Sequence, residues 1–554
     1  MSAKSGRSGA SDKPSGKSRP KSPGSGSGSG SGRSRRSGQL DRFAGSPWAL
    51  IPTFLLALAI RFIHLDQMNS YEDFRTPILD EAFSWDLASR FLAGFGSVGR
   101  PFDADPGVAL FVSVLVRVVG TRPDLVLACL AVLGSGAAVL VQLLGNRVLG
   151  GAAGLFCGLI AAVYRPAIHH GAHVVDAAFV PFVAALALLL MAIQSESKRP
   201  LPELISGFLG GAATMLLVLF QAPLIILAPI VLVVLIFDRK MKIPQKLRRG
   251  LSFSAGALGV MALLTVLNSP AAHGAGSSPF LFRNVVPPGF GREFHLANRD
   301  GNRAGDRLPP HWAPADPAGL AAAYVEEGAR VSALEGHVVP LTENARNPAS
   351  VNAVAIDRAW SDRTGREAAG HPWGFLSGWA WRAWRNLNGA EAPGPYDMAW
   401  ESGRSWILRL PFPGWALLLP LALAGVMAAR GASKDPALTL VVVWGVAVFI
   451  AIWPFAVTSR ARMAIEPALI VLAVRGAMRL FGLVGKRDMP ALARAGLVVG
   501  IAAILVRLPV GGTGPAPFHR LMGQAYESRG AIRAASEHRD EAERRSRGDT
   551  RLGR

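Results

Sequence analysis

The sequence predicts an all-α polytopic membrane protein: a bundle of about eleven transmembrane helices, with surface helices and a large extracytoplasmic loop. Of its 554 residues, 50% are hydrophobic and only 18% are charged, whereas soluble domains carry about a quarter charged residues. The mean hydropathy is +0.30, and the stretch Leu204–Phe237 contains no charged residue. These runs exclude a water-soluble enzyme, and they also exclude an outer-membrane barrel, whose strands alternate in period two.

The predicted crossings are apolar segments, several of them close to the ~20 residues that a helix needs to span a bilayer. They are 47–64, 124–144, 151–168, 174–193, 203–218, 220–237, 251–268, 407–429, 437–456, 463–481 and 491–509. Basic residues gather in cytoplasmic loops, so the basic stretch before 47–64 places the N-terminus in the cytoplasm.

Segment 106–120 is a weaker apolar run, and its placement decides the topology. If it crossed, the most basic loop, 239–249, would lie outside the cell membrane, against the positive-inside bias. We therefore expect 106–120 to form a helix at the outer surface. The sequence as a whole indicates a multi-pass protein of a bacterial cell (inner) membrane.

These segments divide the chain into five regions. The first region has ten Lys/Arg against two acids over residues 1–42 and is rich in Ser and Gly, so it predicts a disordered arm drawn to anionic lipid. No aromatic side chains are interleaved with these charges, so no nucleic-acid partner is expected. The regions are the basic cytoplasmic arm 1–46, an N-terminal transmembrane module 47–268 with an acidic extracytoplasmic loop 65–123, an extracytoplasmic insert 269–405, C-terminal transmembrane helices 406–510 and a charged helical tail 511–554.

Two groups of side chains on the predicted outer face are candidates for catalysis. Asp80 and Glu81 follow Pro77 in the acidic loop; they are either helix-terminal acids favoured by the helix dipole or a general base for an acceptor hydroxyl. Asp176 stands at the edge of an apolar segment, where an acid needs a partner. It follows a cluster of histidines at positions 169, 170 and 173 whose spacing is not specific for a metal, so no metal ligand is assigned and a divalent metal stays unsupported. The two cysteines, Cys129 and Cys157, are expected to pack as small apolar side chains.

A third outer group holds two arginines, Arg460 and Arg462, against the positive-inside bias. Their partner is either lipid head groups or a substrate phosphate, which the guanidinium fork binds in bidentate fashion. Arg61, at the outer end of the first predicted helix, either extends toward the interface or joins the same site. Carboxylates and a phosphate-binding cation in a cavity that faces lipid are suited to the transfer of a group from a donor linked to lipid phosphate.

The order of these motifs resembles the GT-C superfamily of membrane glycosyltransferases, and it is most similar to glycosyltransferase family 39, which includes protein O-mannosyltransferases and the aminoarabinose transferase acting on lipid A. The resemblance covers about 47–510. The residues that carry it are Arg61, Pro77, Asp80-Glu81, Asp105-Pro106-Gly107, Val174-Val175-Asp176, Glu293-Phe294 to Asn298, and Arg460-Ala461-Arg462 with Pro467. The chain differs from the family pattern at Phe83 and Ala461, where tyrosine is usual.

The resemblance implies that Asp80 activates the acceptor, that Glu81 and Asp176 assist, and that Arg462 and Arg460, with Arg61, bind the donor phosphate. It extends the candidate site to residues for the acceptor or sugar, which are His170, His173, Phe294 and Asn298. The expected activity moves a sugar from a polyprenyl-phosphate donor to a lipid, polysaccharide or protein on the extracytoplasmic face. No cofactor is predicted, and the expected partners are the donor and membrane lipids. The alternatives are a flippase of lipid-linked saccharide, a scaffold, and a catalytically degenerate relative.

Overall fold

The computed structural model describes ten stretches of the chain, and every regular element in them is a helix, which confirms the all-α prediction. The described residues are 46–92, 106–237, 241–273, 294–295, 297–298, 353–390, 397–429, 435–455, 457–509 and 515–547. The predicted basic arm, apart from residue 46, and most of the predicted insert lie outside them.

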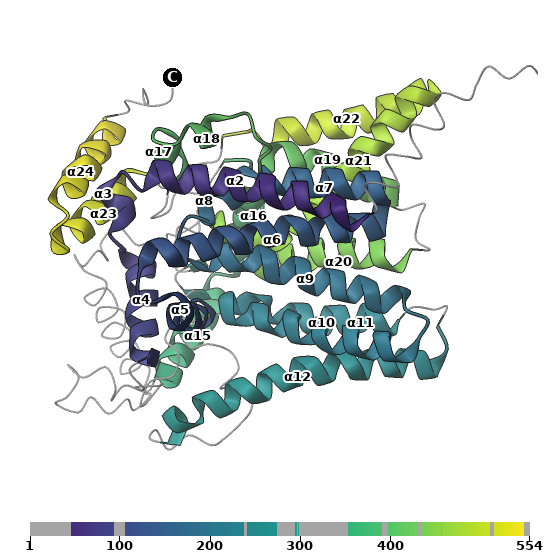
Figure 1. The fold of residues 1–554 in the computed structure, drawn as a ribbon, viewed down its shortest axis with the longest axis horizontal. Coiled ribbons are helices and arrows are strands. Elements are labelled where there is room, and N and C mark those ends of the chain that lie inside the picture. Colours follow the sequence, from purple (N-terminus) through teal and green to yellow (C-terminus); the bar gives the residue numbers. More distant parts are fainter. Residues whose placement is uncertain are drawn as a thin grey trace, which may run out of the picture.

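Long helices running side by side form the body of the protein (Figure 1). They are α2 (Leu50–Met68), α6 (Pro123–Leu149), α7 (Gly151–Ala162), α9 (Asp176–Glu196), α10 (Pro200–Phe220), α11 (Leu227–Ile236), α12 (Ile243–His273), α19 (Trp415–Ala429), α20 (Pro436–Ile452), α21 (Glu466–Lys486) and α22 (Met489–Leu505). Each of the eleven predicted apolar segments overlaps one of these helices. Within the described residues, five helical segments are long and apolar enough to cross a membrane, beginning at Pro47, Pro123, Asp176, Pro200 and Arg460. The chain is thus a multi-pass membrane protein, and the number of crossings stays a prediction.

Shorter helices gather mainly at one end of the bundle, which we call the site end; it carries α3, α4, α5, α23 and α24, at the left of Figure 1. The remaining elements are η1 (Pro47–Ala49), α3 (Glu72–Arg75), α4 (Leu79–Leu92), α5 (Pro106–Val119), α8 (Arg165–His170), η2 (Ala222–Ile226), α15 (Ala353–Gly370), α16 (Pro372–Leu387), α17 (Met398–Ser402), α18 (Trp406–Arg409), η5 (Arg460–Ile465), α23 (Ala516–Ser528) and α24 (Ile532–Ser546). Helix α4 runs across the direction of the long helices. Helix α5, the predicted surface helix, packs on α4 and on the end of α10.

Glycine lets the helices of the body approach closely. A Cβ atom on Gly476 of α21 would collide with the carbonyl oxygen of Leu421 in α19, and one on Gly425 of α19 would collide with that of Leu472. Small residues at crossings serve this purpose in membrane bundles, where packing replaces the hydrophobic effect as the force between helices. The α19–α21 contact therefore depends on two reciprocal glycines.

We predict that Gly476→Val destabilises the protein by about 1–3 kcal/mol or more, because the added side chain must push the backbones of α19 and α21 apart. Gly482→Val is the matched control in the same helix, since no atom of the described part of the chain lies within 4 Å of a Cβ at that position. Unfolding in mixed detergent micelles measures both variants. Equal stability of the two would contradict the packing described here.

Candidate functional site

The histidine cluster is built by the short connection between α7 and α9. After α7 the backbone of Tyr164 is extended, and Pro166 lies in the first turn of the six-residue helix α8. That helix ends at His170, so His173 lies in the following turn and not on the helix. The rings of His169 and His173 nevertheless lie edge to face with centroids 5.5 Å apart. A tight turn, and not helical spacing, brings these two imidazoles together.

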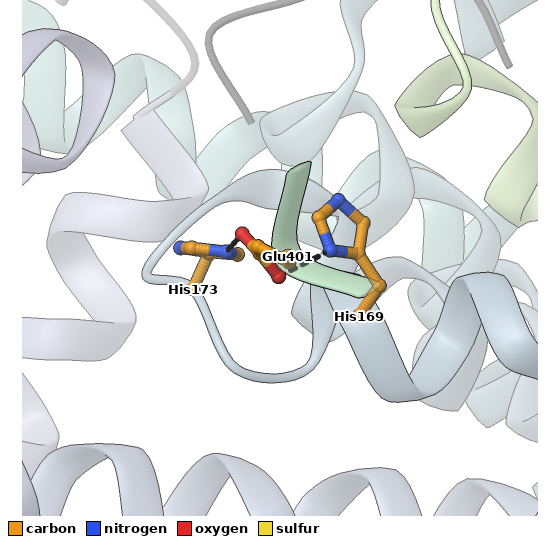
Figure 2. Close-up of side chains that lie close together, drawn as sticks. All are labelled: His169, His173 and Glu401. Carbon is orange, nitrogen blue, oxygen red and sulfur yellow. Dashed lines mark hydrogen bonds and ion pairs between the residues drawn. The ribbon is translucent and has the colours of Figure 1, made fainter. Parts of the chain in front are cut away.

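Glu401 of α17 joins the two imidazoles, as Figure 2 shows. His169 Nδ1 lies 2.7 Å from Glu401 Oε2, and His173 Nε2 lies 2.6 Å from Glu401 Oε1. An ionised carboxylate only accepts hydrogen bonds, so both imidazoles donate to it. All three side chains are buried, with Glu401 exposed by 4%. The Asp397 side chain caps α17 by accepting from the backbone N–H of Ala399 at 2.8 Å, which fixes the short helix that carries Glu401.

Glu81 reaches the same cluster from α4. Its Oε1 accepts a hydrogen bond from the backbone N–H of Val174 at 2.8 Å and lies 3.2 Å from His173 Nδ1. His173 therefore stands between two carboxylates, one on each ring nitrogen. Donation from both nitrogens requires the doubly protonated, positively charged imidazole. Asp80 begins the same helical turn, but its side chain lies outside what the structure describes.

The charges of this cluster support one another in a buried setting. Burial alone would lower the pKa of His173, but Glu401 and Glu81 outweigh it and raise the pKa to about 10. Burial opposes the ionised form of Glu401, yet His169 and His173 hold its pKa well below the usual value. Next to them, burial and then the two neighbouring histidines lower the pKa of His170 well below 6.5, so that ring is neutral. The centre is a carboxylate bound to a protonated imidazole.

The same three side chains could hold a metal ion. One ligand atom from each of His169, His173 and Glu401 lies within 4.8 Å of the others. Two imidazole nitrogens and one carboxylate oxygen are a donor set that Zn²⁺ uses in proteins, where a fourth position is left for water or substrate. Within the described residues, the buried Nε2 of His169 has no hydrogen-bond partner.

A second polar cluster adjoins the first. Gln221, which follows α10, donates through Nε2 to Asp176 Oδ2 at 2.8 Å and to the carbonyl oxygen of Arg460 at 3.1 Å. The guanidinium of Arg460 lies 3.6 Å from Asp176. His170 Nε2 lies 3.1 Å from the hydroxyl of Ser459, the residue before Arg460. Asp176 and Arg460 are thus paired, and His170 connects them to the histidine cluster.

The other two predicted arginines, Arg462 and Arg61, donate to backbone carbonyl oxygens. Arg462 donates to the carbonyl oxygens of Asn388 and Ala390, at 2.8 Å and 3.3 Å, and its guanidinium lies 5.1 Å from the centroid of the Trp415 ring. Arg61 is buried inside the bundle and donates to the carbonyl oxygens of Ala57 and Ala162. Its role as a donor-phosphate ligand stays a prediction, and these contacts indicate an internal role for it.

Phe294 and Asn298 belong to a separate aromatic cluster with α16. The Asn298 amide donates to the carbonyl oxygens of Phe294 and Pro454, and its oxygen accepts from Trp379 and Arg382. Phe294 packs against Phe375 and Phe455. The structure therefore does not place this pair among the contacts of the histidine cluster, and the predicted role of these residues in sugar binding stays a prediction.

A cavity borders the histidine cluster. Glu81, His173 and Glu401 line one side of it, and Asp73, Phe74 and Trp400 contribute to its wall. The remaining lining residues are Met68, Asp397, His519, Met522 and Tyr526. Helix α23, which belongs to the predicted charged tail, thus supplies part of the wall.

Two residues of these clusters were not singled out in the sequence. Glu401 lies in a tryptophan-rich stretch of the predicted insert, where no spacing marks it, and Gln221 lies between two apolar runs. The signal that could have pointed to Glu401 is chemical: three buried histidines need an acceptor on the same face. His169 belongs to the histidine cluster seen in the sequence, but it is not among the predicted site residues.

Comparison with known proteins finds distant structural relatives. No family model matches the chain, and no curated protein sequence matches it. The chain is similar in structure to the archaeal oligosaccharyltransferase AglB from Archaeoglobus fulgidus in complex with an inhibitory peptide and a dolichol-phosphate, with 15% identity, 88% of this chain and 59% of that chain covered, and a TM-score of 0.41. It is also similar to ArnT from Cupriavidus metallidurans bound to undecaprenyl phosphate, with 13% identity, 89% and 74% of the two chains covered, and a TM-score of 0.40. The chain thus spans about three-fifths of the oligosaccharyltransferase. These similarities are distant, so they assign no activity to this chain.

We predict that Glu401→Ala destabilises the protein by about 3–5 kcal/mol, because it leaves the protonated His173 buried without its strongest partner. The matched control is Glu543→Ala, which removes a carboxylate from an exposed pair with Arg547 and changes stability by less than about 1 kcal/mol. Thermal unfolding in detergent compares the two. A Glu401→Ala protein as stable as the control would show that this ion pair does not support the fold.

Proposed function

We propose that this protein is a GT-C-type membrane glycosyltransferase that moves a sugar from a polyprenyl-phosphate donor to a lipid, polysaccharide or protein acceptor at the extracytoplasmic face. The observation that carries the proposal is the juxtaposition of two clusters at the site end: Glu81, His173 and Glu401 in one, Asp176 and Arg460 in the other. Both clusters lie in a bundle of apolar helices, and this setting supports a lipid-linked substrate.

The chemistry assigns a different task to each cluster. Transfer of a sugar from a phosphate requires a base for the acceptor hydroxyl and positive charge for the departing phosphate. Arg460, fixed by Asp176 and by the contact of Gln221 with its carbonyl oxygen, is suited to the phosphate. Arg462 lies two residues further along η5 and adds positive charge there.

Of the two neighbouring acids in α4, we assign the base to Asp80 and the anchoring role to Glu81. Glu81 is bound to the backbone of Val174 and to His173, so its oxygens hold α4 against the histidine turn. Both of these contacts occupy the Oε1 atom of Glu81, which supports a structural role for this carboxylate. Asp80, its neighbour in the same turn, is the acid left for the acceptor.

We predict that Asp80→Asn lowers transfer by about 10²–10⁴-fold without loss of stability, because only the general base is removed. Membranes containing the protein are supplied with labelled polyprenyl-phosphate sugars, and release of free polyprenyl phosphate is followed. Asp124→Asn, which alters an exposed pair with Arg122, is the control and is expected to retain full activity. Equal release by wild type and Asp80→Asn would remove Asp80 from the mechanism. No release above background by the folded wild type would favour the flippase or scaffold alternatives.

We also propose that His169, His173 and Glu401 hold a divalent cation in the working enzyme, which would replace the protons that the two imidazoles donate to Glu401. The donor set fits Zn²⁺, as described above, and the cluster is buried at the side of the cavity. When bound, such an ion supplies positive charge that acidifies a coordinated hydroxyl. The residues of this chain fix the ligands: the Glu81 carboxylate orients His173, and Asp397 caps the helix that carries Glu401.

We predict that purified wild type binds about one more Zn²⁺ per chain than Glu401→Gln, since the variant lacks the anionic ligand. Metal content is measured by mass spectrometry after loading and dialysis. His371→Ala, which removes an exposed imidazole, is the control and is expected to match wild type. If wild type and Glu401→Gln hold the same amount of metal, the cluster is held together by its proton alone.

A further inference from the structure

The C-terminal helices form a hairpin that packs mainly on itself. Helices α23 and α24 are joined by a turn in which Gly530 adopts a positive φ of 76°. The buried apolar cluster of this C-terminal hairpin includes one residue from outside it, Ile78, which precedes α4. The members of this small core are Ile78, Leu521, Met522, Ala525, Tyr526, Ala531, Ala534 and Ala535. Most of this cluster therefore lies between the two helices of the hairpin.

Polar contacts attach the hairpin to the site end. The hydroxyl of Tyr526 donates to the carbonyl oxygen of Asp73 at 2.8 Å, and the backbone N–H of Ala534 donates to Glu72 at 3.0 Å. On the other side, Arg545 lies 2.7 Å from Asp397. Arg404, which follows α17, pairs with Asp73 of α3 and with Glu537 of α24. Attachment by ion pairs and hydrogen bonds responds to protonation, whereas attachment by apolar contact does not.

A histidine pair lies at the centre of this attachment. Nδ1 of His519 in α23 lies 2.8 Å from Nδ1 of His538 in α24. The outer nitrogens face carboxylates, His519 Nε2 at 3.5 Å from Asp397 and His538 Nε2 at 3.4 Å from Asp73. The rings are 1% and 0% exposed. Trp400 packs against both of them, and Tyr526 stacks on His538.

The short distance between the two Nδ1 atoms leaves room for only one proton between them. One nitrogen must donate and the other must accept, so at least one ring is neutral. If both rings were charged, two N–H groups would face each other at a distance of 2.8 Å between nitrogens. Uptake of a second proton is therefore incompatible with the docked geometry.

The two carboxylates that face the histidine pair, Asp397 and Asp73, both have lowered pKa values. Asp397 stays ionised, because His519 and Arg545 outweigh burial and lower its pKa to about 2. Asp73 also has a lowered pKa, since His538 and Arg404 outweigh burial. The remaining charged groups of the attachment are Glu72, Glu537, Glu541 and Arg545. Burial raises the pKa of the Tyr526 hydroxyl well above 10, so this side chain stays neutral.

The inner side of the hairpin is also a wall of the candidate site. His519, Met522 and Tyr526 line the same cavity as Glu81, His173 and Glu401. Trp400, which packs against both histidines of the pair, directly precedes Glu401 in α17. Movement of the hairpin would therefore open the cavity beside the histidine cluster.

We propose that the C-terminal hairpin is a cap on the candidate site, which is docked at neutral pH and detaches when the His519–His538 pair takes up a second proton. The meaning of the cap for catalysis rests on the proposed function, but docking itself is measured without substrate. In the docked state burial, together with the neighbouring His519, lowers the pKa of His538 below 6.5 despite the contact with Asp73. The detached state binds the proton more tightly, so docking weakens as the pH falls below about 6.5.

The test measures the distance between spin labels on the body and on the cap. The labels are placed at Ser70→Cys, after α2, and Ser536→Cys in α24, both exposed, with Cys129→Ala and Cys157→Ala in the background. We expect a single narrow distance at pH 8 and a broad, longer distribution at pH 5. An unchanged narrow distance at pH 5, or a broad distribution at both pH values, overturns the proposal.

The double variant His519→Gln/His538→Gln is the matched control, because its amides still donate and accept but do not take up protons. We expect it to keep the narrow distance at both pH values. A pH response equal to that of wild type would assign the effect to another group and overturn the proposal. If the double variant is already detached at pH 8, the two single variants replace it, and each is expected to flatten the response.

The transfer assay separates the cap from the proposed function. If the distance between the spin labels changes with pH but wild type shows no transfer, the cap proposal holds and the proposed glycosyltransferase activity is contradicted. If transfer depends on Asp80 but the distance between the labels does not change with pH, only the cap proposal is contradicted.

Discussion

The architecture of the site end depends on one charged imidazole, that of His173, held between Glu81 and Glu401. Each carboxylate comes from a different part of the chain, and each would be costly to bury without the positive charge between them. The backbone N–H of Val174 donates to the same oxygen of Glu81, and the imidazole of His169 donates to the other oxygen of Glu401. Three segments are thus fixed by one proton and four hydrogen-bond contacts. The preference of buried ions for complete partnership helps to explain why α4, the histidine turn and α17 meet. Apolar packing contributes as well, because Ile168 of α8 and Met398 of α17 belong to one buried cluster.

The fold follows from the sequence because its signals are local. Runs such as Leu204–Phe237 predict helices by hydropathy alone, and the structure has α10 and α11 there. Close crossings such as that of Gly425 and Gly476 were not predicted, because a glycine in an apolar helix does not identify the helix it will face. Whether a segment forms a helix is determined by about twenty neighbouring residues. Which helices pack together depends on surfaces that become complementary only after folding.

The candidate site was predictable to the extent that its residues break a local pattern. Glu81, Asp176 and the histidines stand out as polar groups beside apolar runs, and the structure describes contacts for each. Glu401 does not stand out, because its stretch contains other charged residues and no periodicity. Arg61 stands out for the same reason as Asp176, yet it donates to carbonyl oxygens of Ala57 and Ala162 in the bundle interior. An isolated charge therefore indicates that a partner exists but not whether that partner is a substrate.

The long separation between His173 and Glu401, 228 residues along the chain, has a consequence for biosynthesis. When the histidine turn leaves the ribosome, the carboxylate that completes it has not been translated, and at about 5–20 residues per second it follows only after tens of seconds at the slow end of that range. The first helices must therefore enter the membrane with an unfinished polar turn, open to water or to insertion factors. Closure of the turn late in synthesis ties maturation of the site to the arrival of α17.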